Sequence, residues 1–209
     1  FMASAVLRGL VECRALEPTD QGWRVDRAAL ADASSSSQTA TFLTRRLELL
    51  PAQTVRLLSV GAVLGKQFSL QAAQQLADMT PRQAIKALDQ ARNRHLVWIQ
   101  PDGAQCVFIH DKIRGAVLER MALEDVQRTH RRAAEYLLEE APDRVSDIAY
   151  HYHAAEESEA AFPFAVQAAH QARVQYALEI AEQQYRIALC GARSDEDRFR
   201  INEGLGDTL

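Results

Sequence analysis

Residues 51–110 contain three helical segments and then two short apolar runs around a turn, and this order constrains the fold more than any other feature. Pro51 suits the first turn of a helix, and "PAQTVRLLSVGAVLG" predicts an apolar helix that ends at Gly65. Ser69 is predicted to cap a second helix, "LQAAQQLADM". The first two helices are therefore joined by only a few residues.

The start of the third helix has the most specific pattern in the chain. Thr80 suits the N-cap, Pro81 the first helical position, and Gln83 lies three residues after the cap, as a capping box requires. We expect this helix to run to about His95, with two residues buried on its apolar face, Ile85 and Leu88.

The two apolar runs that follow are "LVWIQ" and "AQCVFIH", separated by "PDG". Alternating apolar residues on both sides of a Pro- and Gly-containing turn predict a strand, a turn and a second strand. Three helices followed by a hairpin of this size are typical of a winged-helix domain. We place this domain at residues 40–122, with a further helical stretch at 40–50 as its start.

From residue 111 to the end the pattern is entirely helical. Helices are expected at 111–121 and 124–141, and four more helical segments follow at spacings of 15 to 18 residues. Alanine recurs where helices would cross closely (Ala165, Ala168, Ala169, Ala172, Ala181, Ala188). Paired helices that repeat about every 34 residues favour a truncated tetratricopeptide-like solenoid at 123–209. The expected fold class is therefore mainly α, with one small β-hairpin.

The N-terminal residues 1–39 are harder to assign. We expect a helix at 2–16, a loop at 17–22, a short "WRV" and a short helix at 26–32. Both ends of the sequence lie inside helical patterns, so we expect a piece of a longer chain.

Charge also divides the sequence: residues 51–122 carry 9 basic and 5 acidic side chains, whereas residues 123–209 carry 9 basic and 17 acidic side chains. This asymmetry favours a domain boundary near 122.

Composition excludes several classes of protein. The three cysteines are far apart and odd in number, which argues against a zinc site and a disulfide framework and favours a reducing, cytoplasmic setting. No apolar run approaches 18 residues, so no membrane contact is expected. The sequence has no Gly-rich phosphate loop and no nucleophile elbow, so we expect no catalytic site and no enzyme activity in this chain.

A His-Asp pair, His110 and Asp111, stands between the second strand and the next helix. One interpretation is turn chemistry, with a partly buried His110 at a strand end and Asp111 as a helix cap. The other interpretation is that His110 contacts a ligand held by another part of the protein. The residues themselves leave both open.

Several motifs, in their order and spacing, resemble the region that follows the nucleotide-binding core in bacterial STAND-class signalling ATPases. They are "FLTRRLELLPAQTVRLLSVGAVLGKQFSL", "FIHDKIRGAVLERM", "RTHRRAAEYL" and "DIAYHYHAA". The resemblance implies that residues 1–39 are the end of the ATPase lid and a linker. The winged helix and the repeats would then belong to a multidomain regulator, in which an effector such as a kinase, a cyclase or a DNA-binding module is also present.

The same resemblance implies a role for the His-Asp pair. His110 would contact the β-phosphate of ADP, and Asp111, as N-cap, would fix where the helix starts. The ATP or ADP and its Mg²⁺ are expected in an upstream core, which would be the partner of this chain in cis, and this chain would hold no cofactor of its own. The helical repeats would bind a protein partner or relay the signal to an effector.

Two other functions compete with this one. A winged helix can bind DNA, and the third helix carries four basic residues that could follow phosphates, Arg82, Lys86, Arg92 and Arg94. The turn "QPDGAQ" has no Lys or Arg, which argues against a DNA-binding wing. A plain protein-interaction scaffold is the third possibility.

A metal site at His151 and His153 is not expected, because residues two apart on a helix point to different faces.

Overall fold

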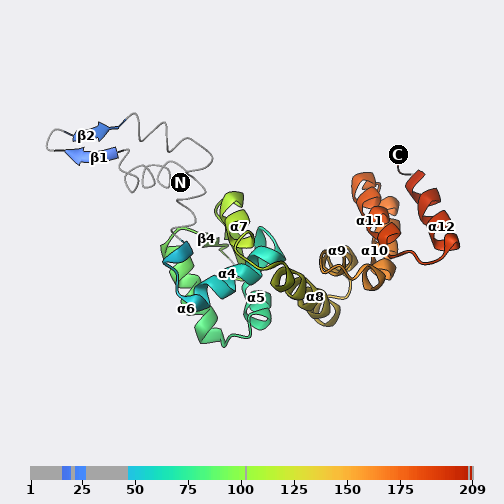
Figure 1. Cartoon of the computed structure of the whole chain (residues 1–209), viewed down its shortest axis with the longest axis horizontal. Coiled ribbons are helices and arrows are strands. Elements are labelled where there is room, and N and C mark those ends of the chain that lie inside the picture. The colour runs from blue at the N-terminus through green and yellow to red at the C-terminus, as the bar shows by residue number, and fades with distance from the viewer. Residues whose placement is uncertain (1–15, 20–21, 27–46, 102, 207, 209) are drawn as a thin grey trace. The chain divides into compact units, whose positions relative to one another are not determined.

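A computed structural model describes residues 16–19, 22–26, 47–101, 103–206 and 208 (Figure 1). The helices expected at 2–16 and 26–32 lie outside the described residues, except for their end residues Leu16 and Asp26. The stretch 40–50 is described only from residue 47. The chain is mainly helical with a small β-hairpin, as the sequence predicts. It divides into two compact units, which we describe separately. The first unit consists of Phe1–Ala62, Lys66–Leu70 and Met79–Arg120, and the second of Val63–Gly65, Gln71–Asp78 and Met121–Leu209.

The N-terminal residues that the structure describes form a two-stranded hairpin. β1 (Leu16–Thr19) pairs antiparallel with β2 (Gly22–Val25). The loop expected at 17–22 is therefore wrong in part, because 17–19 belong to β1 and Gly22 is the first residue of β2. Polarity suggested the loop, but cross-strand pairing, including an ion pair between Arg24 and Glu17, decides the conformation.

The first two predicted helices of residues 51–110 are confirmed in kind and order. They are α4 (Ala52–Leu64), which ends before Gly65, and α5 (Leu70–Leu76), which begins directly after Ser69. Gly65 has φ of 143°, a conformation that glycine adopts readily and other residues rarely do. It ends α4 as the sequence predicts.

The third helix, α6 (Pro81–Asn93), begins as predicted. The Thr80 side chain accepts from the Gln83 N–H, and the Gln83 side chain accepts from the Thr80 N–H at 2.9 Å. Leu88 is buried, but Ile85 is 54% exposed, so its expected burial is wrong. The buried stripe follows positions 84, 87, 88 and 91, and Ile85 lies about 100° around the helix from Ala84.

The predicted hairpin is also present, and a strand that the sequence analysis missed joins it. β4 (Val97–Ile99) and β3 (Gln67–Ser69) both pair antiparallel with β5 (Gln105–Phe108), which gives the order β3-β5-β4. One face of this sheet is buried through Phe68, Val97, Cys106 and Phe108. The ring of Phe68 lies so close to α4 that a Cβ on Gly61 would approach it to 2.7 Å, so this crossing needs a glycine.

The last helix of the first unit is α7 (Asp111–Leu118), directly after β5. The second unit consists of α8 (Leu123–Glu140), α9 (Val145–Ala154), α10 (Ser158–Val174), α11 (Leu178–Gly191) and α12 (Asp195–Gly206), together with most of α5. Each of these later helices falls in a segment that the sequence predicts to be helical.

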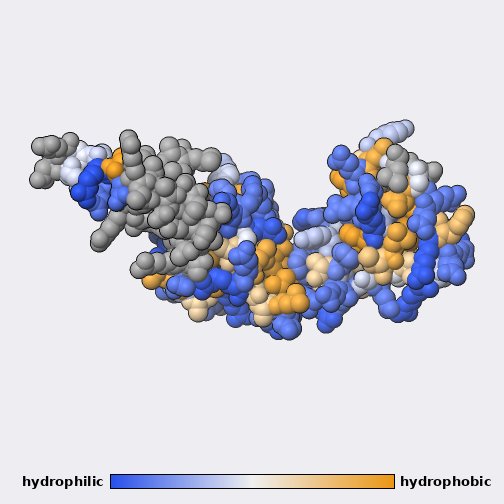
Figure 2. Space-filling model, turned by 45° about the horizontal axis from the view of Figure 1, so that its top comes forward, coloured by the Kyte–Doolittle hydropathy of each residue, from blue (hydrophilic) through white to orange (hydrophobic). Residues whose placement is uncertain are grey.

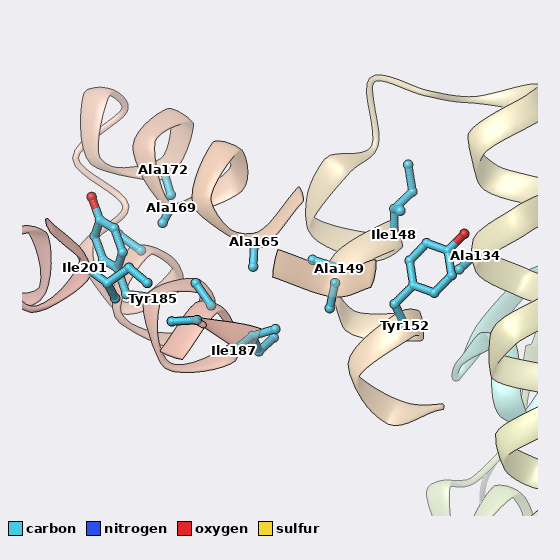
Figure 3. Packing of buried hydrophobic residues seen from close by; sticks show 14 of the residues in the cluster. Ala134, Ile148, Ala149, Tyr152, Ala165, Ala169, Ala172, Tyr185, Ile187 and Ile201 are labelled. Atoms are coloured by element: carbon cyan, nitrogen blue, oxygen red, sulfur yellow. The ribbon is translucent and has the colours of Figure 1, made fainter. Parts of the chain in front are cut away.

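Small residues hold the helices of the second unit close together. The alanines predicted at helix crossings are buried, and Figure 3 shows Ala165, Ala169 and Ala172 of α10 facing the helix that carries Tyr185 and Ile187. A Cβ on Gly191 of α11 would lie 2.1 Å from the backbone oxygen of Ser158 at the start of α10. The close approach of α10 and α11 therefore depends on residues with little or no side chain.

Candidate functional site

His110 lies at the end of β5 and caps α7. Its backbone is extended, with φ of −145° and ψ of 141°, and its Nδ1 accepts the backbone N–H of Lys112 at 3.1 Å. Asp111 is the first residue of the helix, so the predicted role of Asp111 as N-cap is wrong. The backbone turns into the helix one residue later than that role requires, and the imidazole provides the capping acceptor.

This cap determines what His110 offers to a ligand. A ring whose Nδ1 accepts a hydrogen bond is neutral and carries its proton on Nε2. The side chain is exposed, so the Nε2–H is available as a donor. His110 can therefore donate one hydrogen bond to an anionic oxygen without giving up its structural role.

Asp111 pairs with a residue that the sequence analysis did not single out. The Nζ of Lys66 lies 3.1 Å from Oδ1 and 3.2 Å from Oδ2 of Asp111. Lys66 directly precedes β3, and its carbonyl accepts the N–H of Phe108 at 2.9 Å. The two side chains are 58% and 70% exposed, so the pair contributes little to stability and can separate easily.

A second contact fixes the direction of α7. The Nε of Arg114 donates to the backbone oxygen of Ala62 at 2.8 Å, in the last turn of α4. A cation at the carbonyl end of a helix is favourable, because it meets the negative end of the helix dipole and an unpaired carbonyl. The contact joins residues 52 positions apart, so no local pattern predicts it.

The four basic candidates of α6 lie on a different element from His110. Arg82, Lys86 and Arg92 are exposed on α6, and Arg94 is its exposed C-cap residue. Arg82 and Lys86 are four positions apart and share one side of the helix. Arg92 forms an ion pair with Asp89 at 3.3 Å, which offsets part of its charge.

Two histidines of the second unit form a buried pair. Nδ1 of His130 on α8 lies 2.8 Å from Nδ1 of His151 on α9, and both residues are buried. Burial, together with the neighbouring His130 and Arg144, lowers the pKa of His151 from 6.5 to about 3. One ring donates and the other accepts, so their shared hydrogen bond is internal to the pair, and the low pKa of His151 keeps that ring neutral.

Other kinds of site find no support in the described part of the chain. No group of three or more His, Cys, Asp or Glu side chains there is arranged to hold a metal ion. Burial raises the pKa of the Cys106 thiol to about 11, so this thiol is a poor nucleophile. Within the same residues, no helix has the length and apolar character needed to span a membrane.

No protein-family model, curated protein or solved structure matches this chain. The functional interpretation therefore depends on the chain's own residues and their geometry. Of the two histidine arrangements, the buried pair satisfies itself, whereas His110 presents a donor to solvent next to Lys66 and Asp111. The end of the sheet at His110 is the better candidate for a binding site.

Proposed function

We propose that this chain is a non-catalytic regulatory part of a cytoplasmic STAND-class signalling ATPase. Residues 40–122 would form its winged helix and residues 123–209 its tetratricopeptide-like repeats. The order α4, α5, α6, β4, β5 supports the winged helix, and the Ala-rich crossings of α10 and α11 support the repeats. The four motifs that resemble the STAND-class sequences support the family.

The observation that carries this proposal is the hydrogen bonding and exposure of His110. The imidazole caps α7 through Nδ1, and the exposed residue leaves Nε2 as the nitrogen that could donate to a phosphate oxygen. In the proposed mechanism an upstream nucleotide-binding module holds ADP and its Mg²⁺, and His110 donates to the β-phosphate. This contact favours the closed state, and its loss shifts the population toward the open state.

The repeats would receive a partner protein. Figure 2 shows hydrophobic surface over α10 and α11 in the second unit. Around the turn between these helices four apolar side chains are exposed, Val174, Tyr176, Leu178 and Ile180, and Tyr176 is 88% exposed. A cluster of exposed apolar residues is typical of a protein-interaction surface. It supports the part of the proposal in which the repeats relay a signal.

The test compares two substitutions of His110 in the natural protein that carries this chain. His110→Ala removes the imidazole and the cap, whereas His110→Asn removes the imidazole but keeps a good N-cap acceptor. Both variants should release bound ADP faster and raise basal output, because both lack the phosphate contact. If His110→Asn retains ADP as the unsubstituted protein does, His110 is not the sensor.

DNA binding by the winged helix is the alternative function. Its support is that Arg82, Lys86, Arg92 and Arg94 are all exposed on or next to α6. Phosphate contacts make affinity for random duplex DNA fall steeply with salt. Salt-dependent binding that Arg82→Gln and Lys86→Gln weaken would support this alternative, and the absence of binding at low salt would remove it.

A scaffold that binds proteins without nucleotide control would show neither DNA binding nor an effect of His110→Asn on ADP retention.

A further inference from the structure

The turn between α10 and α11 places a tyrosine where the backbone does not favour one. Tyr176 has φ of 58°, in the left-handed region, and its N–H donates to the carbonyl of Arg173 at 3.0 Å. A helix that ends in this conformation usually has glycine there, and sometimes asparagine, because a larger side chain crowds the backbone. A bulky residue is an outlier in this region, so the turn itself does not explain Tyr176.

Two other helices of the chain end in the same kind of turn without an aromatic residue. The residue in the left-handed region is Glu156 at the end of α9, with φ of 61°, and His95 at the end of α6, with φ of 56°. At all three ends, three successive N–H groups donate to carbonyls at the same spacings along the helix. The hydrogen bonds of the turn therefore do not require a phenol ring.

The core of the unit does not require the ring either. Tyr176 is the most exposed of the large apolar side chains that the structure describes, and its neighbours Val174, Leu178 and Ile180 are exposed as well. We call these four residues the turn cluster. Leu178 and Ile180 are two positions apart and point to different sides of α11, so the cluster surrounds this end of the two helices. Strain that the fold does not need, among exposed apolar residues, indicates a contact surface.

The charges of this unit indicate which kind of partner fits the turn cluster. Residues 123–209 carry 9 basic and 17 acidic side chains. All nine basic side chains lie in the described part of the chain, and eight of them form ion pairs with carboxylates. The positive charges are therefore mostly neutralised within the chain, and a partner meets an excess of negative charge. Complementarity then favours a basic partner.

One carboxylate of this excess lies next to the turn cluster. Glu179 is in the first turn of α11, three residues after Tyr176, and is exposed. Glu182 pairs with Arg186, whereas Glu179 forms no ion pair with a described residue. An aromatic ring attracts a cation to its face, and a carboxylate pairs with the same cation. Tyr176 and Glu179 together therefore suit the side chain of a lysine or an arginine.

We propose that the turn cluster and Glu179 bind a basic amphipathic helix of a partner protein. The turn cluster contacts the apolar face of this helix, and Tyr176 and Glu179 hold a lysine or arginine at the edge of that face. The described part of the second unit consists of helices and turns, so it offers an extended segment no strand edge for pairing. This inference rests on the proposed function, in which the repeats receive a partner protein, and it names the chemistry of that partner.

The first test adds two synthetic peptides to the whole chain, each of about 15 residues with leucine along one helical face. One peptide carries lysine on its other face, and the second carries glutamate. The lysine peptide should bind with saturation and shift the backbone NMR signals of residues 174–180, whereas the glutamate peptide should not bind. Equal binding of the two peptides, or saturable shifts confined to other residues, would overturn the inference.

Two substitutions test the residues themselves. Tyr176→Asn and Glu179→Gln should each weaken binding of the lysine peptide about three- to tenfold. Asparagine adopts the left-handed conformation more readily than tyrosine, so Tyr176→Asn should unfold at an equal or higher urea concentration. Weaker binding without loss of stability is what a binding residue predicts. A variant that unfolds more easily, or that binds the peptide normally, would show that Tyr176 is not such a residue.

Two substitutions on α12 are matched controls. Phe199 is an aromatic residue that is 69% exposed, and Glu203 is an exposed carboxylate with no ion-pair partner among the described residues. Phe199→Asn and Glu203→Gln should leave the affinity for the lysine peptide unchanged. An equal loss in the controls would mean nonspecific adsorption to an acidic surface and would reject the assignment to the turn cluster.

One further measurement separates other occupants and other failures. Self-association of the chain that Tyr176→Asn abolishes would identify a second copy as the occupant and would replace the basic partner. Failure of the lysine peptide to bind rejects this inference and leaves the nucleotide contact of His110 untouched. Normal ADP retention in the natural protein with His110→Asn rejects the proposed function, whatever the peptide does.

Discussion

The two units of this chain place histidines in opposite surroundings. His130 and His151 are buried and share a hydrogen bond of 2.8 Å between their Nδ1 atoms. His110 is exposed at the end of β5 and uses Nδ1 to cap α7. The comparison teaches that surroundings decide the chemistry of an imidazole: burial pairs His130 with His151, whereas the exposed His110 uses one ring nitrogen as a helix cap and keeps its side chain open to solvent.

The largest expected effect concerns two helix glycines, one in each unit, whose surroundings are packed to different degrees. Gly191→Ala should destabilise the second unit by about 3 kcal/mol, because the new methyl group would meet the backbone of Ser158. Gly115→Ala in α7 should stabilise the first unit by about 0.5–1 kcal/mol, because nothing lies within 4 Å and alanine favours a helix. Chemical unfolding of both variants checks this contrast, and equal effects would contradict it.

The next effect concerns pH and the buried pair. Because the pKa of His151 is about 3 in the folded chain and 6.5 unfolded, the unfolded chain binds more protons between these values. Stability is therefore fully present above pH 6.5 and is lost as the pH falls toward 3. The free energy of unfolding should fall by about 2 kcal/mol between pH 7 and pH 5. Urea unfolding at both values measures it.

The control for this prediction is His151→Gln, whose amide can still pair with His130 but does not titrate. Its stability should depend less steeply on pH over the same range. An unchanged slope in His151→Gln would show that other groups cause the pH dependence and that the buried pair is not the sensitive element of the second unit.

A smaller effect separates the two roles of His110. His110→Ala should cost about 1 kcal/mol through loss of the helix cap, whereas His110→Asn should cost at most a few tenths. Hydrogen exchange of the first amides of α7 reports the difference, because these amides fray when the cap is lost. Equal exchange in the two variants would mean that the Nδ1 contact with Lys112 does not stabilise the helix.

The smallest effect is expected at the ion pair beside His110. Lys66→Gln should change the free energy of unfolding by less than about 0.5 kcal/mol, because both partners are exposed. A larger loss would show that Lys66 is a structural residue, and the comparison with the buried pair would then fail. Thermal unfolding at low and moderate salt gives this measurement.

The sequence predicted those features that depend on neighbours along the chain. The capping box at Thr80 and Gln83, the end of α4 before Gly65 and the hairpin of β4 and β5 are all local. β3 was missed because its three residues pair with Cys106 and its neighbours, far along the sequence. Ile85 was misplaced because α6 buries a stripe of alanines, which carry little hydrophobic weight in a pattern.

The residues of the candidate site also divide into those visible in the sequence and those that only the fold brings together. His110 was visible in the sequence as the last residue of an apolar run before a helix, but which of His110 and Asp111 caps the helix depends on backbone angles. Lys66 was not visible, because only the pairing of β3 with β5 brings it next to Asp111 and His110. Register is a tertiary property, and no single segment contains it.

The most direct test of the central claim follows the ring nitrogens of all these histidines when ADP is added to the natural protein freed of nucleotide. The account predicts that Nε2 of His110 shifts and saturates with ADP, while the signals of His130 and His151 stay where they are. A His110 signal that moves no more than those of the buried pair would contradict the account.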